Sequence, residues 1–163
     1  MSSTISPALK GLITAVIMIA LSLILFYTNQ KGDSYLVYLP YIIYALGIGW
    51  TLVAYRRSRS VAPKFKELFG QGFRCFIVIT LVMVIFLGLF IKAHPEFKEE
   101  NAKLYKEQMI REKSKLPAEI DAEIIKYKDR FNTSFVSASI FGYLIIGAVI
   151  TAGCSAFLIS RKQ

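Results

Sequence analysis

The stretch CFIVITLVMVIFLGLFI, residues 75–91, decides the fold because it holds no charged side chain over its whole length. A helix needs about 20 mostly apolar residues to cross the hydrocarbon core of a bilayer. Gly72 and Phe73 extend this run at its N-terminal end. Inside lipid every backbone N–H and C=O must be paired within the protein, so a run of this kind has to be helical. It predicts a membrane span at about residues 71–92.

Three further uncharged runs of similar length occur in the chain, which has 163 residues, is 55% hydrophobic and has a mean hydropathy of +0.49. They predict spans at about residues 8–28, 34–55 and 132–160. The predicted fold class is therefore all-α: an integral membrane protein with a bundle of four transmembrane helices, in a single membrane domain over residues 1–163. The first run is longer than the apolar core of a signal peptide, so we expect it to remain in the mature protein.

The charges between the spans predict the orientation of the chain. Six basic side chains and one acidic side chain lie within residues 56–74, and short loops rich in Lys and Arg stay in the cytoplasm. The first charge of the chain is Lys10, and a basic tail of Arg161 and Lys162 follows the last span. We therefore expect both termini to be cytoplasmic and the loop 93–131 to lie on the opposite side of the membrane.

The basic residues between the second and third spans predict contacts with anionic lipid head groups at the cytoplasmic face, where each cation gains about 1 kcal/mol. The residues expected to make these contacts are Arg56, Arg57, Arg59, Lys64, Lys66, Gln71 and Arg74. Much of the net charge of +9 is explained by its position beside the spans. We therefore expect no nucleic-acid binding, which needs a basic surface on a soluble domain.

The stretch FKELFGQGFRCF, residues 65–76, contains two glycines beside a basic residue. It is not typical of a phosphate-binding glycine loop, because no strand precedes it. Apolar and charged residues alternate at helical spacing over residues 63–69, which predicts a short amphipathic helix in the inner interface. Gly70 and Gly72 would then let the chain either turn or pack closely where the third span begins.

The last span carries rows of small residues. Helices in lipid associate where small side chains let their backbones approach. The residues predicted to form such a face are Gly142, Gly147, Ala148, Thr151, Ala152 and Ser155. Two interpretations remain open at this point: packing within the bundle, or docking of another membrane protein or a second copy of the chain.

The segment 95–131 is predicted to form an external charged helical hairpin between the third and fourth spans. Its break falls at SKLPAE, and Pro117 is expected at the first position of the second helix. This helix can run straight into the last span, since RFNTSFV contains no Gly or Pro. The hairpin can close on itself, lie on the membrane surface, or offer a contact surface to a partner.

The spans offer little that catalysis or transport would use. Their cores hold no Asp, Glu, Lys, Arg or His, which ion-driven carriers usually retain there. The sequence shows no cluster with metal-ligand spacing and no Ser/His/Asp arrangement. We therefore expect no enzymatic activity, no catalytic residues, no metal and no cofactor. The alternatives are a small lipid or solute transporter, a homo-oligomeric pore, or an enzyme for which Gln71, Arg74 and the loop arginines converge on a lipid head group.

Three features follow one another along the chain. A basic second loop leads into FKELFGQGFRCFIVIT (65–80), and HPEFKEENAKLYKEQMIREKSKLPAEI (94–120) follows as a charged external segment. The last span is rich in small residues and ends in a basic tail. In this order the features resemble the family called domain of unknown function 4199, small four-span membrane proteins of Gram-negative bacteria. The resemblance covers nearly the whole chain, with Gly72 where that family often has Ala.

This resemblance implies an inner-membrane location, with loop 93–131 in the periplasm, and a four-helix architecture. It implies no activity, and it links the chain to neighbours that handle lipid-linked sugars. The leading hypothesis is a non-catalytic accessory or scaffold subunit of an envelope complex, linked to the metabolism of lipid-linked sugars. The partners expected are anionic membrane lipids and a membrane protein or a second copy of the chain.

Overall fold

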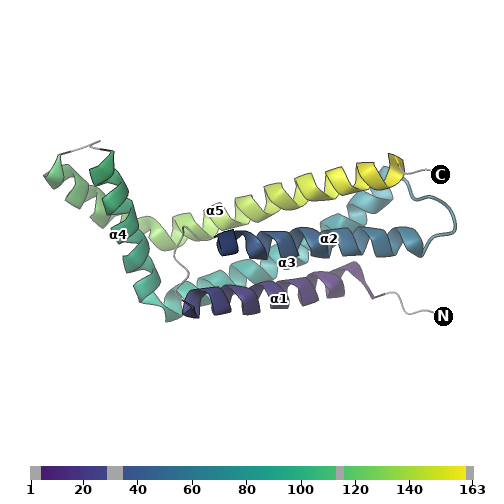
Figure 1. Cartoon of the computed structure of the whole chain (residues 1–163), viewed down its shortest axis with the longest axis horizontal. Helices are drawn as coiled ribbons and strands as arrows, with labels where there is room; N and C mark the ends of the chain where they lie inside the picture. The colour runs from purple at the N-terminus through teal and green to yellow at the C-terminus, as the bar shows by residue number, and fades with distance from the viewer. Residues whose placement is uncertain (1–4, 29–34, 113–115, 161–163) are drawn as a thin grey trace. The chain divides into compact units, whose positions relative to one another are not determined.

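A computed structural model describes residues 5–28, 35–112 and 116–160, which form five α-helices and one short 3₁₀ helix with no strand among them. The predicted all-α fold class is confirmed. The elements are α1 (Pro7–Tyr27), the 3₁₀ helix η1 (Tyr35–Tyr38), α2 (Leu39–Arg57), α3 (Phe65–Ala93), α4 (Pro95–Arg111) and α5 (Pro117–Ser160) (Figure 1). The basic tail of Arg161 and Lys162 lies outside the described residues.

Within the described part of the chain, three helices are long and apolar enough to cross a membrane, namely α1, α3 and α5. The chain therefore has the helices of a membrane protein. The sequence predicts a further span at residues 34–55, but α2, which has 19 residues, is not among the three. Its tyrosines, Trp50 and the two arginines of its last turn lower its hydropathy, and η1 occupies the start of the predicted span.

The contacts divide the chain into two compact units. The first unit contains Met1–Met83 and Phe141–Gln163, and the second contains Val84–Ile140. α1 and α2 belong wholly to the first unit and α4 wholly to the second, whereas α3 and α5 contribute residues to both.

Helices of the first unit approach one another closely at several glycines. A Cβ atom on Gly11 of α1 would lie 2.6 Å from the backbone oxygen of Cys75 in α3. A Cβ atom on Gly47 of α2 would overlap the side chain of Thr14 in α1. Such contacts are how helices associate in lipid, where burial of apolar surface gives little driving force.

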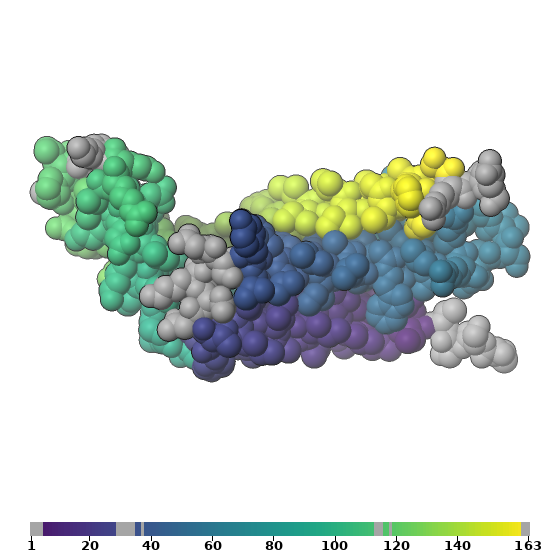
Figure 2. Space-filling model, viewed as in Figure 1, coloured from purple at the N-terminus to yellow at the C-terminus, as the bar shows by residue number. Residues whose placement is uncertain are grey.

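The outer surfaces of the first unit are apolar. Figure 2 shows α1, α2 and the C-terminal part of α5 side by side on one face. Large hydrophobic side chains are exposed on each of the four helices of this unit, among them Leu9, Val16, Ile24, Ile42, Leu46, Leu81, Ile145, Val149 and Phe157. A soluble monomer rarely exposes so much contiguous apolar surface, so these faces suit contact with lipid tails.

α3 begins at Phe65 and continues to Ala93 without interruption. Residues 65–69, expected in a separate interfacial helix, are therefore its first turns, and the chain makes no turn at Gly70 or Gly72. Of the two roles expected for the glycines, close packing is found at Gly72, where a Cβ atom would overlap the side chain of Thr151 in α5. The same atom on Gly70 would have nothing within 4 Å.

In the second unit, α4 packs along the N-terminal part of α5. Two ion pairs join the helices, Lys106 Nζ with Asp121 Oδ1 at 2.6 Å and Lys128 with Glu99. Lys128 donates a hydrogen bond to the carboxylate, which lowers the pKa of Glu99. Residues later in α4 pair with residues earlier in α5, so the two helices run antiparallel.

Two predictions about the last helix are confirmed. α5 begins at Pro117, whose missing N–H costs nothing at the first helical position. It then continues to Ser160 as one helix of 44 residues, so the second helix of the predicted hairpin runs straight into the last predicted span. The preceding Ser114 and Lys115 of the predicted break lie outside the described residues.

Candidate functional site

A cavity of about 630 Å³ lies in the first unit, between the start of α1, the end of α2 and the start of α3. Three of the residues predicted to contact lipid head groups line it, namely Arg57, Arg59 and Gln71. Lys10 lines it as well. None of the described residues that line the cavity is acidic, so it is a polar space of a single charge sign.

The end of α2 fixes the position of one of these cations. Ser58 caps the helix, with its backbone N–H on the carbonyl of Ala54 at 3.1 Å and its hydroxyl on the carbonyl of Tyr55 at 2.8 Å. Arg59 then folds back and donates to the Tyr55 hydroxyl at 3.0 Å. Its guanidinium carbon lies 5.0 Å from the centre of the Tyr55 ring, a distance suited to a cation–π interaction.

Lys10 is the residue of this site that sequence reasoning missed. It lies in the first turns of α1 and is only 7% exposed, and its Nζ atom lies 5.4 Å from the centre of the Trp50 ring. From the sequence alone it is a single charge near the beginning of a span, and such lysines usually extend towards the head groups. Only the packing of α1 against α2 encloses it.

The other predicted head-group residues are not brought into the cavity. Arg56 is half-buried, while Lys64, Lys66 and Arg74 are exposed on or just before α3. An enzyme acting on a head group would need Arg74 to converge with Gln71 and the loop arginines. Gln71 lines the cavity and Arg74 does not.

Part of the predicted small-residue face lies in the interior of the first unit. Gly147, Thr151 and Ser155 are buried, and a Cβ atom on Gly147 would lie 2.8 Å from the ring of Phe76 and would overlap the hydroxyl of Tyr44. This row packs within the chain. The remaining three predicted residues lie elsewhere on α5: Ala148 and Ala152 are half-buried, and Gly142 has open space beside it.

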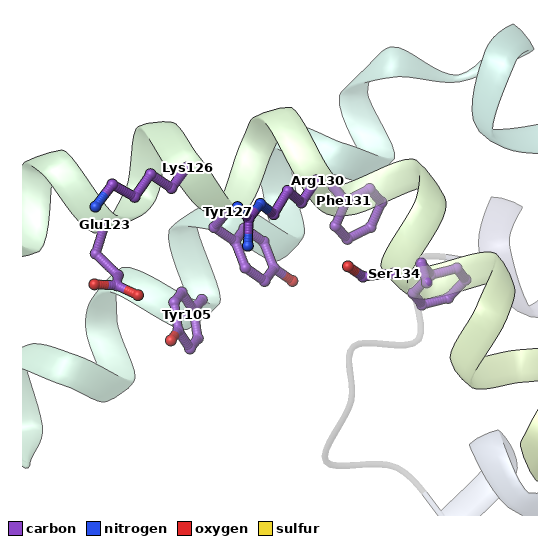
Figure 3. Close-up of a pocket in the computed structure, with 8 residues that line it drawn as sticks. Tyr105, Glu123, Lys126, Tyr127, Arg130, Phe131 and Ser134 are labelled. Carbon is purple, nitrogen blue, oxygen red and sulfur yellow. The ribbon is translucent and has the colours of Figure 1, made fainter.

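A groove of about 610 Å³ lies in the second unit, between α4 and α5 (Figure 3). Its aromatic lining includes Tyr105 of α4, which stacks on Tyr127 of α5 with ring centres 4.6 Å apart. Phe131 also lines the groove; it is buried and stacks on Phe135. These four rings form the aromatic floor of the groove.

Charged and polar side chains surround that floor. Lys126 and Arg130 lie one turn apart on α5 and are both exposed, and Ser134 follows one turn later (Figure 3). Among the described residues of the lining, Glu123 is the one that is acidic. The groove therefore combines an aromatic floor with a basic edge.

Across residues 5–28, 35–112 and 116–160, no group of three or more His, Cys, Asp or Glu side chains is placed to hold a metal ion. The one histidine, His94, precedes α4, with its Nδ1 atom 2.7 Å from Glu96 Oε1. This hydrogen bond lowers the pKa of Glu96. The pair lies at the N-terminal end of α4, where a carboxylate suits the helix dipole.

The helices and their apolar faces define an all-helical membrane protein. Its family is equally clear: the family described as "Protein of unknown function (DUF4199)" matches residues 10–160, and the chain belongs to it. This confirms the resemblance noted from the sequence. Comparisons with curated proteins and with solved structures gave no match.

Proposed function

We propose that this chain is a four-span protein of the bacterial inner membrane, with both termini in the cytoplasm and loop 93–131 in the periplasm. α2 provides the fourth span in this proposal. Its packing against α1 supports this, as does the hydrogen bond that the buried Tyr44 hydroxyl donates to the carbonyl of Tyr143 at 2.8 Å. A tyrosine satisfied in this way can be accommodated within lipid, where an unpaired hydroxyl would be costly.

The exposed basic residues near the start of α3 support the orientation. Lys64, Lys66 and Arg74 would contact anionic head groups of the cytoplasmic leaflet, while α4 and the start of α5 carry mixed charges and would face the periplasm.

Within this topology, the chain acts as a non-catalytic accessory or scaffold subunit of an envelope complex, associated with the handling of lipid-linked sugars. The observation that carries the proposal is the groove between α4 and α5. Tyrosine, phenylalanine and arginine are enriched in protein interfaces, where the aromatic rings bury large areas and the guanidinium group pairs with carboxylates. The occupant we propose is a periplasmic segment of a membrane protein, with apolar side chains for the aromatic floor and carboxylates for Lys126 and Arg130.

Site-specific photo-crosslinking in cells tests this proposal. A benzophenone amino acid in place of Ser134, inside the groove, is expected to give one discrete adduct with a membrane protein. The double charge reversal Lys126→Glu and Arg130→Glu should abolish that adduct, because the basic edge would then repel the partner's carboxylates. The matched control places the same crosslinker at Lys103, which is exposed on α4 and does not line the groove.

Equal adducts from positions 134 and 103 would contradict the proposal, as would an adduct that survives the charge reversal. The partner is identified by mass spectrometry and confirmed by the reciprocal capture, starting from the tagged partner.

A further inference from the structure

We propose that the cavity between α1, α2 and α3 in the first unit is a binding site for a phosphate group. This inference concerns a different surface from the groove between α4 and α5. It does not depend on whether a partner occupies that groove.

The described lining of the cavity is positively charged. Lys10, Arg57 and Arg59 come from two helices and a loop, and they line one cavity whose described lining has no acidic residue. A concave site lined by charges of one sign concentrates its electrostatic potential and attracts the opposite ion. Arginine in addition presents paired N–H donors that match the oxygens of a phosphate.

Lys10 is largely enclosed by protein. The residue as a whole is 7% exposed, so its side chain has lost much of its water, and its ammonium group would be stabilised by an anion or acceptors nearby. The described residues provide it with the face of Trp50 at 5.4 Å, which compensates only in part. No ion pair joins it to a carboxylate in the described part of the chain. A phosphate oxygen in the cavity would supply an anionic partner.

Several hydrogen-bond donors already lie at the wall of the cavity. Arg59 is held by the ring and the hydroxyl of Tyr55, so binding an anion would require little further ordering. Ser6 and Pro7 bring the N-terminus of α1, the positive end of its helix dipole, to the cavity wall. Gln71 on α3 adds an amide that can donate to an oxygen.

The phosphate could be carried by a lipid head group or by a soluble compound. In the proposed topology the cavity lies at the cytoplasmic interface, where lipid phosphates are found. Its volume of about 630 Å³ leaves room for more than the phosphate itself. The chemistry common to both sources is a phosphate group, whose anionic oxygens accept hydrogen bonds from several cations.

Calorimetric titration of the protein in nanodiscs of neutral phosphatidylcholine tests the site. One titration uses dihexanoyl phosphatidic acid and a second uses inorganic phosphate. We expect saturable binding of at least one of them. Lys10→Gln and, separately, Arg57→Gln should each weaken it by about tenfold or more, as expected for the loss of a charged hydrogen bond. Lys103→Gln removes an equal charge from an exposed site on α4, which lines neither the cavity nor the surface expected to contact head groups, and should leave the affinity unchanged.

The pattern of results separates the sources. If only phosphatidic acid binds, and Lys10→Gln and Arg57→Gln weaken its binding, the ligand is a lipid phosphate. If inorganic phosphate binds with the same affinity as phosphatidic acid, the ligand is a soluble phosphate. The proposal is overturned if neither probe binds saturably, or if Lys10→Gln and Arg57→Gln bind as tightly as Lys103→Gln does. Arg57 is exposed, so its variant decides the matter if Lys10→Gln does not fold.

Discussion

Gly147→Leu is expected to lower the free energy of unfolding of the first unit by about 3 kcal/mol, the upper part of the range for overpacked cores. The new side chain would meet the ring of Phe76 and the hydroxyl of Tyr44. It would also displace the Tyr44 hydroxyl from the carbonyl of Tyr143 and leave buried polar atoms without partners. Denaturant unfolding in mixed micelles, followed by circular dichroism, measures the change.

The matched controls are Gly142→Leu and Gly153→Leu on the same helix. A Cβ atom at either position would meet nothing within 4 Å, so we expect little change in stability. The comparison also decides between the two roles that the sequence left open for the row containing Gly147. If Gly147→Leu unfolded no more easily than the controls but lost a co-purifying subunit, the row would be a docking face, and the packing described above would be contradicted.

Gly72→Ala is expected to destabilise the first unit by about 2 kcal/mol, because the added methyl group would overlap the side chain of Thr151. Thr151→Ala removes the atoms that obstruct it. Thr151 is fully buried, and its hydroxyl has no hydrogen-bond partner within the described residues, so loss of the hydroxyl should cost little and loss of the buried methyl group about 1 kcal/mol. In the double variant the methyl group added at position 72 would fill part of that space. The double variant should therefore be nearly as stable as the native protein.

A double-mutant cycle over these variants measures the coupling between the two positions. We expect a favourable coupling of about 1–2 kcal/mol, as is typical of residues in direct contact. Additive effects would mean that Gly72 and Thr151 do not meet, and that α3 and α5 are packed differently in the first unit.

The helical class was predictable because a backbone inside lipid must pair its own N–H and C=O groups, which a single segment can do only as a helix. The uncharged run 75–91 shows from the sequence alone that such a segment is present. The uninterrupted course of α5 was predictable too, from Pro117 at its start and the lack of Gly or Pro between Arg130 and Val136. Such features depend on neighbours along the chain. The same local reasoning suggested a separate interfacial helix at 63–69, and the structure instead begins α3 at Phe65.

The roles of individual small residues could not be predicted in the same way. Gly72 and Gly70 look alike in sequence, yet one touches Thr151 and the other has open space. Gly142 and Gly147 were assigned to one face, although only Gly147 packs against α2 and α3. Which glycine meets a neighbouring helix depends on the rotation of that helix, and periodicity within one span does not determine it.

The cavity illustrates the same limit. Arg57, Arg59 and Gln71 were predicted from the positive charge of one loop, and they do lie together. Lys10 is separated from them by more than 40 residues, and only the contact between α1 and α2 encloses it. A sequence shows how many charges there are, but their burial is a tertiary property.

The most direct test of the proposed topology is alkaline phosphatase fused after Arg59, with fusions after Lys31 and Lys113 for comparison. The enzyme is active only when exported. The proposed topology predicts an inactive fusion after Arg59 and active fusions after Lys31 and Lys113, because α2 would return the chain to the cytoplasm and α3 would take it out again. An active fusion after Arg59 would show that α2 does not cross the membrane, and would contradict both the four-span topology and the cytoplasmic position of the cavity.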